Sequence, residues 1–335
     1  MIGGLKVKSR TAEKVRIGEL LNNQRGIALL LTLVVLVLLT AVIVEFDHGA
    51  RINLITAGNF RDGIQATYLA KAGATAARAV LKDDAKRVES AKYDGLDEFW
   101  ATPFPPYPVG EGFVSVEITD EAGKIDVNRL ADGGTGRDDA RAMLRRLFAV
   151  LELDADAAET IAQSIEDWVD ENDDQGFNGA EDFYYQRLSP PYRCKNGPMD
   201  TISELRLVNG VTPEIYRKIR PYLTTVSLKG PNGNGLININ TADSPVLRTL
   251  YNDITVDTAT CIQNGRPYTP PINADSLTGC ATSCLTDPAC RRRVDGKSGY
   301  FTIQAHGIMH ETEKIATAMI KREGTKTSFI SWQIE

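Results

Sequence analysis

The sequence predicts an α+β protein with a long N-terminal transmembrane helix, an antiparallel sheet and an inserted all-α domain. Three observations lead to this fold class. Residues 27–44 form an uninterrupted apolar run, residues 137–222 have helical periodicity, and strand-like alternation appears on both sides of that helical block. Because neither flanking set of strands makes a sheet alone, we expect the helical residues to be inserted into one α+β domain.

The composition is that of a folded protein with an uneven charge distribution. The chain has 335 residues, 42% apolar and 24% charged, and a net charge of −6. These values exclude a disordered tail, a collagen-like fibre, a polytopic membrane protein and a small disulfide-rich domain. Residues 1–25 carry six basic and two acidic side chains, a charge of +4, so the other 310 residues carry −10. The acidic total argues against nucleic acid as a partner.

Residues 27–44 are 18 consecutive uncharged residues. As a helix they would be about 27 Å long, close to the hydrocarbon thickness of a bilayer. The run has no polar face at helical spacing, which a soluble core helix would need. The basic residues in front of it place the N-terminus in the cytoplasm and the bulk of the chain outside.

Three interpretations of this segment compete. A cleaved secretory signal has a shorter apolar region and a small-residue cleavage site, and the residues after the run offer none. A permanent single-pass anchor fits the hydropathy fully. The third interpretation starts from Arg25, Gly26 and Ile27, because a basic leader that ends in Gly directly before an apolar helix resembles the type IV prepilin signal.

This resemblance implies that a prepilin peptidase removes residues 1–26 as a leader. Cleavage after Gly26 would leave Ile27 as a methylated N-terminus, and the helix would be kept as a membrane anchor and later as the packing core of a filament. Most pilin-like proteins have Glu at the fifth mature position, where this chain has Leu31. A subunit without that carboxylate can give up pairing with a neighbour's N-terminal amine, which suits the end of a filament.

The long helix is expected to continue past the apolar run, because residues 47–87 have few interruptions and an Ala-rich apolar side. We assign residues 27–100 to it and expect the prolines at 103–108 to end it. Residues 112–118 alternate as a strand, and a turn leads from them into residues 125–128.

The helical block contains four helical segments. Asp154 or Asp156 can cap the second of them, and Thr212-Pro213 is a typical helix start. Residues 228–235 form a Gly-rich linker, and residues 236–240 return to strand alternation. The remaining expected elements are a turn-rich stretch with four cysteines at 251–299 and three terminal strands at 300–310, 312–322 and 328–335. The domain boundaries that follow are 101–134 and 236–335 for the α+β domain and 135–235 for the inserted helical domain.

The densest chemical signal is the segment 166–182, with eight carboxylates and no Lys or Arg. Such a concentration of charge favours a bound cation. When Asp170 is counted as position one, the oxygen-bearing residues at positions three, five, nine and twelve match an EF-hand calcium loop. These residues are Asn172, Asp174, Asn178 and Glu181. Gln175 stands at position six, where the EF-hand turn needs Gly, so we expect a different loop path. Asp167 and Asp182 are spare ligands, and a solvated acidic loop is the alternative.

Residues 202–219 look like a helix-hairpin-helix element, and residues 236–250 resemble a strand-to-helix start found in DNA-uptake proteins. A DNA-binding hairpin presents glycines so that backbone N–H groups reach phosphate. Here the hairpin, residues 208–211, has one glycine and follows an acidic loop. Reuse of the hairpin as a protein scaffold is therefore favoured over DNA binding.

Catalytic patterns are weak, and we expect no enzyme activity. His306 and His310 are four apart in a strand-like run, roughly 13 Å from one another and too far for one metal. The chain contains no nucleophile-elbow motif and no phosphate-binding glycine loop.

Four cysteines lie in one turn-rich stretch, on the outside by the charge argument. Two disulfides are expected there, with three possible pairings, and a zinc site is the alternative. The four are Cys261, Cys280, Cys284 and Cys290. Cys194 is left over as a free buried thiol.

Taken together, these features resemble the type II secretion system minor pseudopilin K family. The resemblance is carried by the junction at 25–30, by 167–170 and 178–185 in the acidic loop, by 196–205, by 238–242 and by the terminal strands through Trp332. It covers the chain from Gly26 onward, apart from residues 251–299, which look like a private insertion.

The resemblance implies a type IV pilin-like fold with an inserted calcium-binding α-domain, in a single-pass protein of the bacterial inner membrane with its C-terminal domain in the periplasm. It implies a tip subunit of the type II secretion pseudopilus that initiates and caps assembly with the I and J minor pseudopilins, the major subunit and prepilin peptidase as partners. Family members can bind more than one calcium, so Asp200 and Glu204 are further candidate ligands. The alternative function is a membrane-anchored helix-hairpin-helix protein for DNA uptake.

Overall fold

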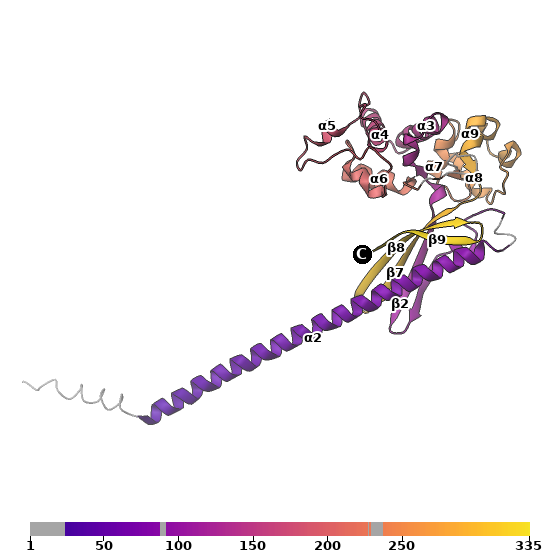
Figure 1. Ribbon diagram of the computed structural model, residues 1–335. Coiled ribbons are helices and arrows are strands. Elements are labelled where there is room, and N and C mark those ends of the chain that lie inside the picture. Colours follow the sequence, from indigo (N-terminus) through magenta and orange to yellow (C-terminus); the bar gives the residue numbers. More distant parts are fainter. Residues whose placement is uncertain (1–23, 88–91, 227, 229–236) are drawn as a thin grey trace, which may run out of the picture. The chain divides into compact units, whose positions relative to one another are not determined.

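The computed structural model describes residues 24–87, 92–226, 228 and 237–335 (Figure 1). Residues 1–62 and 63–335 form two compact units, which are described separately. Most of the predicted leader, up to residue 23, lies outside the described residues. So does the predicted linker at 228–235, apart from Leu228.

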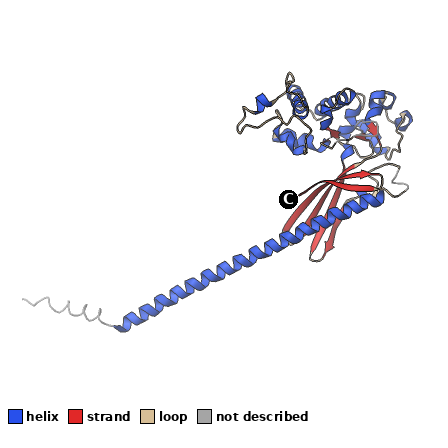
Figure 2. Ribbon diagram, in the orientation of Figure 1, coloured by secondary structure: helices blue, strands red, loops and turns tan. Residues whose placement is uncertain are grey.

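Along the chain, one long helix is followed by two strands, a mostly helical stretch and then three long strands (Figure 2). The α-helices are α2 (Gln24–Asp84), α3 (Thr135–Val150), α4 (Ala155–Val169), α5 (Asp182–Tyr185), α6 (Pro213–Ile219), α7 (Ser244–Leu250), α8 (Val256–Asn264) and α9 (Pro288–Arg293). The strands are β1 (Phe104–Val109), β2 (Gly112–Asp120), β3 (Ile125–Asp126), β4 (Leu223–Thr224), β5 (Ile237–Asn238), β6 (Val294–Asp295), β7 (Tyr300–Met309), β8 (Thr312–Glu323) and β9 (Lys326–Ile334). Short 3-10 helices are η1 (Phe99–Ala101), η2 (Glu121–Gly123), η3 (Val127–Ala131), η4 (Ile202–Leu207), η5 (Arg220–Tyr222), η6 (Ala274–Leu277) and η7 (Cys284–Thr286).

The first unit contains the apolar part of α2. Every side chain at 27–44 is exposed to the surroundings, and α2 is the one helix among the described residues that is long and apolar enough to span a membrane. α2 has 61 residues. It ends at Asp84, however, and not near residue 100, because the chain then turns back to enter the sheet through η1 and β1.

In the second unit, five antiparallel strands form one sheet in the order β1-β2-β7-β8-β9. The three predicted C-terminal strands are confirmed as β7, β8 and β9. Small residues let α2 lie close to the sheet: a Cβ on Gly307 would come within 2.0 Å of the Ala66 carbonyl oxygen. Ala70 and Ala74 of α2 and Ile303 of β7 belong to the resulting core.

The proline cluster, predicted only as the end of the long helix, forms strand β1. Proline lacks the N–H that a central strand must donate, so it is confined to edges. β1 is an edge strand that pairs with β2 alone, and its register is irregular between Phe104 and Tyr107.

The residues between β2 and β7 build one hydrophobic core, which corrects the predicted boundary at residue 235. Leu147 of α3 and Ile165 of α4 belong to the same cluster as Leu250 of α7 and Ile262 of α8. Of the predicted strand at 236–240, the described residues 237–240 do not join the sheet, since β5 pairs only with β6, in parallel, before the chain enters α7. The cysteine-bearing stretch therefore packs with the helices and not with the α+β domain.

The predicted disulfides are present, and their pairing is Cys261–Cys280 and Cys284–Cys290. Cys284 and Cys290 are fully buried, so this bond lies inside the core shared with α3 and α7. Cys194 is a buried free thiol, as expected, and its Sγ lies 3.6 Å from the Asp167 carbonyl oxygen.

A buried ion cluster joins the end of α2 to the sheet. The Arg322 guanidinium of β8 donates to Asp84 at the last turn of α2 (3.1 Å) and to Asp94 in the loop that follows. All three side chains are at most 7% exposed. Arg322 also donates to the Ser298 carbonyl and lies 4.6 Å over the Phe301 ring, so it ties together four segments distant in sequence.

We predict that Arg322→Ala destabilises the protein by about 3–5 kcal/mol, because it leaves buried carboxylates without their cation. Denaturant unfolding of the detergent-solubilised chain measures this loss. The matched control is Arg217→Ala, whose ion pair with Glu214 is 73% exposed on both sides. That control should change stability by no more than about 0.5 kcal/mol. Equal effects of the two substitutions would contradict the prediction.

Candidate metal centre

Helix α4 positions the first candidate ligands. Its start is fixed by Asp154, whose Oδ1 accepts hydrogen bonds from the backbone of Asp156 (3.1 Å) and Ala157 (3.0 Å), as one of the two predicted caps. Ile161 and Ile165 face the core and are fully buried. The helix ends at Val169 with Asp170 as its C-terminal cap, which brings the carboxylates of its last turn to the start of the acidic loop.

Three of the predicted ligands come together as buried carboxylates. Asp167 is 4% exposed, Asp170 7% and Glu181 4%, although they belong to the most acidic segment of the chain. Asp170 and Glu181, positions one and twelve of the predicted loop, lie near enough for the charge of one to act on the other.

The pKa values show how strongly these groups interact. Burial, followed by the charges of Asp167 and Asp170, raises the pKa of Glu181 to about 7. Burial first, and then the charge of Asp170, raises the pKa of Asp167 to about 6. Burial likewise raises the pKa of Asp170. Negative charge at this site is therefore unfavourable without a compensating cation.

Four buried oxygens at the loop have no hydrogen-bond partner. They are Asp170 Oδ1, Glu181 Oε1, Glu181 Oε2 and Asn196 Oδ1. Buried polar atoms are nearly always satisfied, so such a group of acceptors needs an explanation. Carboxylate and amide oxygens are the ligands that calcium prefers, and the donor set fits a hard cation.

Asn196 is a residue that the sequence reasoning missed. Its Nδ2 donates to Asp173 Oδ1 (2.7 Å), which turns its Oδ1 inward, and its φ of 46° is in the left-handed region. Asn tolerates that conformation better than most residues. The dipeptide Asn196-Gly197 is a turn signal that could have drawn attention to it.

Asp167 serves the loop mainly as an acceptor of backbone hydrogen bonds. Its Oδ2 accepts from the Gly176 N–H (3.1 Å), and a Cβ on Gly179 would lie 1.9 Å from the same oxygen. Gln175, at the EF-hand glycine position, donates through its side chain to the Gly179 carbonyl (2.8 Å). The loop path therefore differs from an EF-hand, as predicted.

The other predicted ligands lie elsewhere. Asn172, Asp174 and Asn178 are exposed, and Asn172 Oδ1 accepts from the Asp174 N–H (2.7 Å). Asp182 uses its Oδ1 to accept from the Cys194 N–H (2.7 Å) and its Oδ2 to accept from Gln186 (3.0 Å).

Asp200 and Glu204 form a separate cluster around Lys195. The Lys195 Nζ lies 2.6 Å from Asp200 Oδ2 and 2.9 Å from Glu204 Oε2. Glu204 also accepts from the backbone of Thr201 (3.0 Å) in the capping box of η4. The lysine pairs with both carboxylates and compensates one of their two negative charges.

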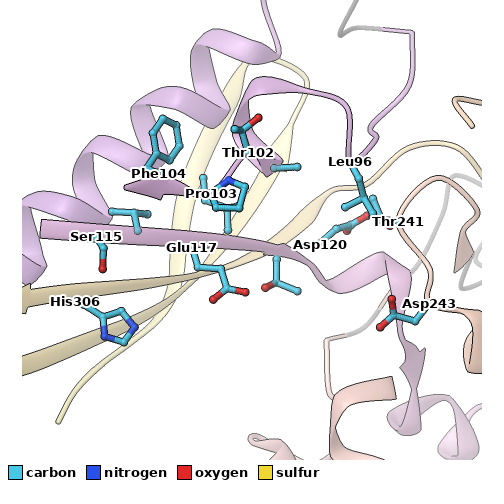
Figure 3. Close-up of a pocket in the computed structure, with 14 residues that line it drawn as sticks. Leu96, Thr102, Pro103, Phe104, Ser115, Glu117, Asp120, Thr241, Asp243 and His306 are labelled. Carbon is cyan, nitrogen blue, oxygen red and sulfur yellow. Dashed lines mark hydrogen bonds between the residues drawn. The ribbon is translucent and has the colours of Figure 1, made fainter. Parts of the chain in front are cut away.

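The structure also has a cavity of about 570 Å³ beside the sheet (Figure 3). Ser115 and Glu117 of β2 and His306 of β7 line its outer part, while Asp120 and Asp243 lie toward its other end. His306 Nδ1 is 2.7 Å from Glu313 Oε1, a half-exposed carboxylate on β8. Ser115 is the register partner of His306 on the neighbouring strand.

The predicted helix-hairpin-helix element is only partly helical. Its first segment is the 3-10 helix η4, and its hairpin turns at Gly210, with a φ of 82°. Arg206 lies 4.4 Å over the Tyr216 ring, so one cation of the predicted element stacks on an aromatic ring of the same element.

Comparison with known proteins gives consistent matches. Residues 123–227 match the family model for Type II secretion system (T2SS), protein K. The Type II secretion system protein K of Pseudomonas aeruginosa is 30% identical over 233 residues, 68% of either chain. That of Pectobacterium carotovorum is 28% identical over 73% of this chain and 76% of its own length.

One solved structure has the same fold. It belongs to the GspK-GspI-GspJ complex of the enterotoxigenic Escherichia coli Type 2 Secretion System. The match has a TM-score of 0.69 at 24% identity, and it covers 84% of this chain and 99% of the other. The pilin-like α+β fold with inserted helices is thereby confirmed.

We predict that, in calcium-free buffer, stability falls as pH rises from 4.5 to about 7, the window between the unfolded and folded pKa of Glu181. The folded state binds the proton of the Glu181 carboxyl more tightly than the unfolded state does. Stability is therefore lost as the pH rises through this window, and the loss is complete above it. Melting temperatures of wild type and Glu181→Gln measure the effect: the variant should be more stable by a few degrees at pH 8, with the gap closing toward pH 4.5.

The control is Asp156→Asn, at the opposite end of α4, which should follow wild type. A gap between wild type and Glu181→Gln that does not depend on pH would refute the prediction.

Proposed function

The chain belongs to the type II secretion system protein K family, and we propose that it is the minor pseudopilin at the tip of the pseudopilus, where it initiates and caps assembly for protein export. The observation that carries this proposal is the pilin-like fold behind a long helix whose apolar run begins directly after Gly26. The comparisons give the DNA-uptake alternative no support. The role is structural and not catalytic.

The partners follow from the matched complex. The related chain is solved together with GspI and GspJ, so we infer that this chain assembles with minor pseudopilins of the I and J types. The major pseudopilin and the prepilin peptidase would be further partners. The side chains of residues 27–44 are exposed along the whole run and therefore need lipid or neighbouring helices around them.

The charge asymmetry supports an orientation across the inner membrane. The +4 segment before residue 26 would stay in the cytoplasm and the C-terminal domain would lie in the periplasm. Disulfides fit that compartment, since they persist in an oxidising environment. Leu31 and the inserted helical residues suit a subunit above which no other subunit adds.

Calcium would stabilise the inserted helical domain. Asp170, Glu181 and Asn196 supply buried oxygens without hydrogen-bond partners, and Asp167 adds negative charge beside them. Asn172, Asp174 and Asn178, the other loop residues that the spacing predicts, are exposed and would have to turn inward to join the coordination. The bound cation would supply the positive charge that these carboxylates need in order to stay ionised when buried.

We predict that co-expression with a prepilin peptidase gives a chain of 309 residues that begins at methylated Ile27. N-terminal sequencing and intact mass measure this. Gly26→Leu should block the shift, because the peptidase recognises the small residue before the cut. An unprocessed wild-type chain would reject the pseudopilin assignment and leave a plain membrane anchor.

For calcium, we expect a concentration one hundred times the dissociation constant to stabilise the chain by about 2.7 kcal/mol. The melting temperature should rise by roughly 5–10 °C, and a chelator should reverse the rise. Asp170→Ala and Glu181→Ala should abolish the response, while Asp156→Asn keeps it. A wild type that ignores calcium, or an Asp170→Ala variant that still responds, would exclude this site.

A further inference from the structure

Phe177, in the acidic loop between α4 and α5, is the most unusual surface residue of the helical stretch. Its side chain is 96% exposed, more than Phe46 in the apolar part of α2, which is 78% exposed. A large aromatic side chain displayed to water loses the benefit of burial. The loop must therefore hold it outward for a reason other than packing.

The backbone on both sides of Phe177 is fixed. The Gly176 N–H donates to the buried Asp167 carboxylate (3.1 Å), and the Asn178 N–H donates to Gln163 Oε1 (2.7 Å). Both acceptors stand on α4, nine and fifteen residues away. The Gly179 N–H closes the turn on the Gly176 carbonyl (3.0 Å). Phe177 is thus presented by a pinned turn and does not fold back onto the protein.

A second aromatic follows at the other end of the loop. Phe183 of α5 is 64% exposed, and the Arg187 guanidinium lies 3.7 Å from its ring centroid. Pre-ordered aromatic side chains are the residues that most often anchor protein interfaces, because they bury much area and lose little conformational entropy.

The charges of the loop select the kind of partner. Glu171 and Asp173 precede Phe177 by at most six residues, both are exposed, and neither is a proposed calcium ligand. An anionic phospholipid surface would be repelled by these carboxylates. A protein pocket that is apolar at its centre and lined by Lys or Arg at its rim matches both features.

We propose that Phe177, with Phe183, is the anchor of a docking surface for a protein that presents an apolar pocket with a basic rim. The proposal rests on the proposed function, since such a partner would be met by the tip of the pseudopilus. Formation of the contact would bury Phe177 and place the exposed carboxylates opposite the basic rim.

The experiment is photo-crosslinking in cells that contain the complete secretion system. p-Benzoylphenylalanine is placed at position 177 of the full chain, and at position 107 as a control, because Tyr107 is 71% exposed on β1. Adducts are identified by mass spectrometry of the crosslinked peptide. Glu171→Lys is compared with Asp156→Lys, a charge reversal of the same size at the other end of α4.

The expected result is a protein adduct at 177 and not at 107, through a peptide with apolar residues flanked by Lys or Arg. Glu171→Lys should lower the yield of the adduct at position 177 at least about tenfold, and Asp156→Lys should leave that yield unchanged. Phe177→Ala should reduce secretion while the melting temperature stays at the wild-type value. Lipid adducts only, no adduct, an acidic contact peptide, or a yield that ignores Glu171→Lys would each overturn the proposal.

Co-isolation of the I- and J-type pseudopilins from the same cells distinguishes failure of the docking surface from failure of the tip assignment. Their presence with Phe177→Ala together with normal secretion refutes the docking surface alone. Their absence with the wild-type chain refutes the tip assignment.

Discussion

The second unit depends on one buried cation. Arg322 is removed from water between Asp84 and Asp94, and that arrangement is tolerable only if the chain brings both carboxylates to it. Their positions fix where α2 ends and how the chain returns to β1. The same guanidinium also stacks on Phe301 of β7, the strand that pairs with β8. The need to pair the buried Arg322 thus selects how α2 and the sheet are arranged. The alanine and glycine contacts between α2 and the sheet provide the close packing.

Further polar contacts link the sheet to the helical residues. Asn238 donates to Asp120 Oδ2 (2.8 Å), Thr241 donates to the same oxygen (2.6 Å), and Thr224 donates to Glu121 (2.6 Å). These bonds connect residues more than one hundred positions apart. The side chains of Asn238 and Thr241 thus hold the end of β2, while β5 pairs with β6 and not with the five-stranded sheet.

The sequence was most informative where a pattern was long. The apolar run could be predicted from its length. α3, α4 and the three terminal strands could be predicted because their periodicity extends over nine or more residues. β1 could not, since prolines signal a helix end more strongly than an edge strand. At the candidate metal centre, spacing pointed to Asp170 and Glu181, which are buried there, but Asn196 comes from a distant turn and no local pattern connects it to them. The sequence also does not distinguish Asp167 from Asp182, two acids of the same segment. In the fold Asp167 is buried and Asp182 is only partly so, and the two have different hydrogen-bond partners.

The apolar part of α2 has a consequence for the path from membrane to filament. With every side chain from 27 to 44 facing outward, the segment is never at rest in water and only exchanges one hydrocarbon environment for another. Leucine at position 31 means that no carboxylate has to lose or find a counter-charge during that exchange. Extraction of this subunit is then close to a transfer between two equivalent solvents, a step that can run in both directions.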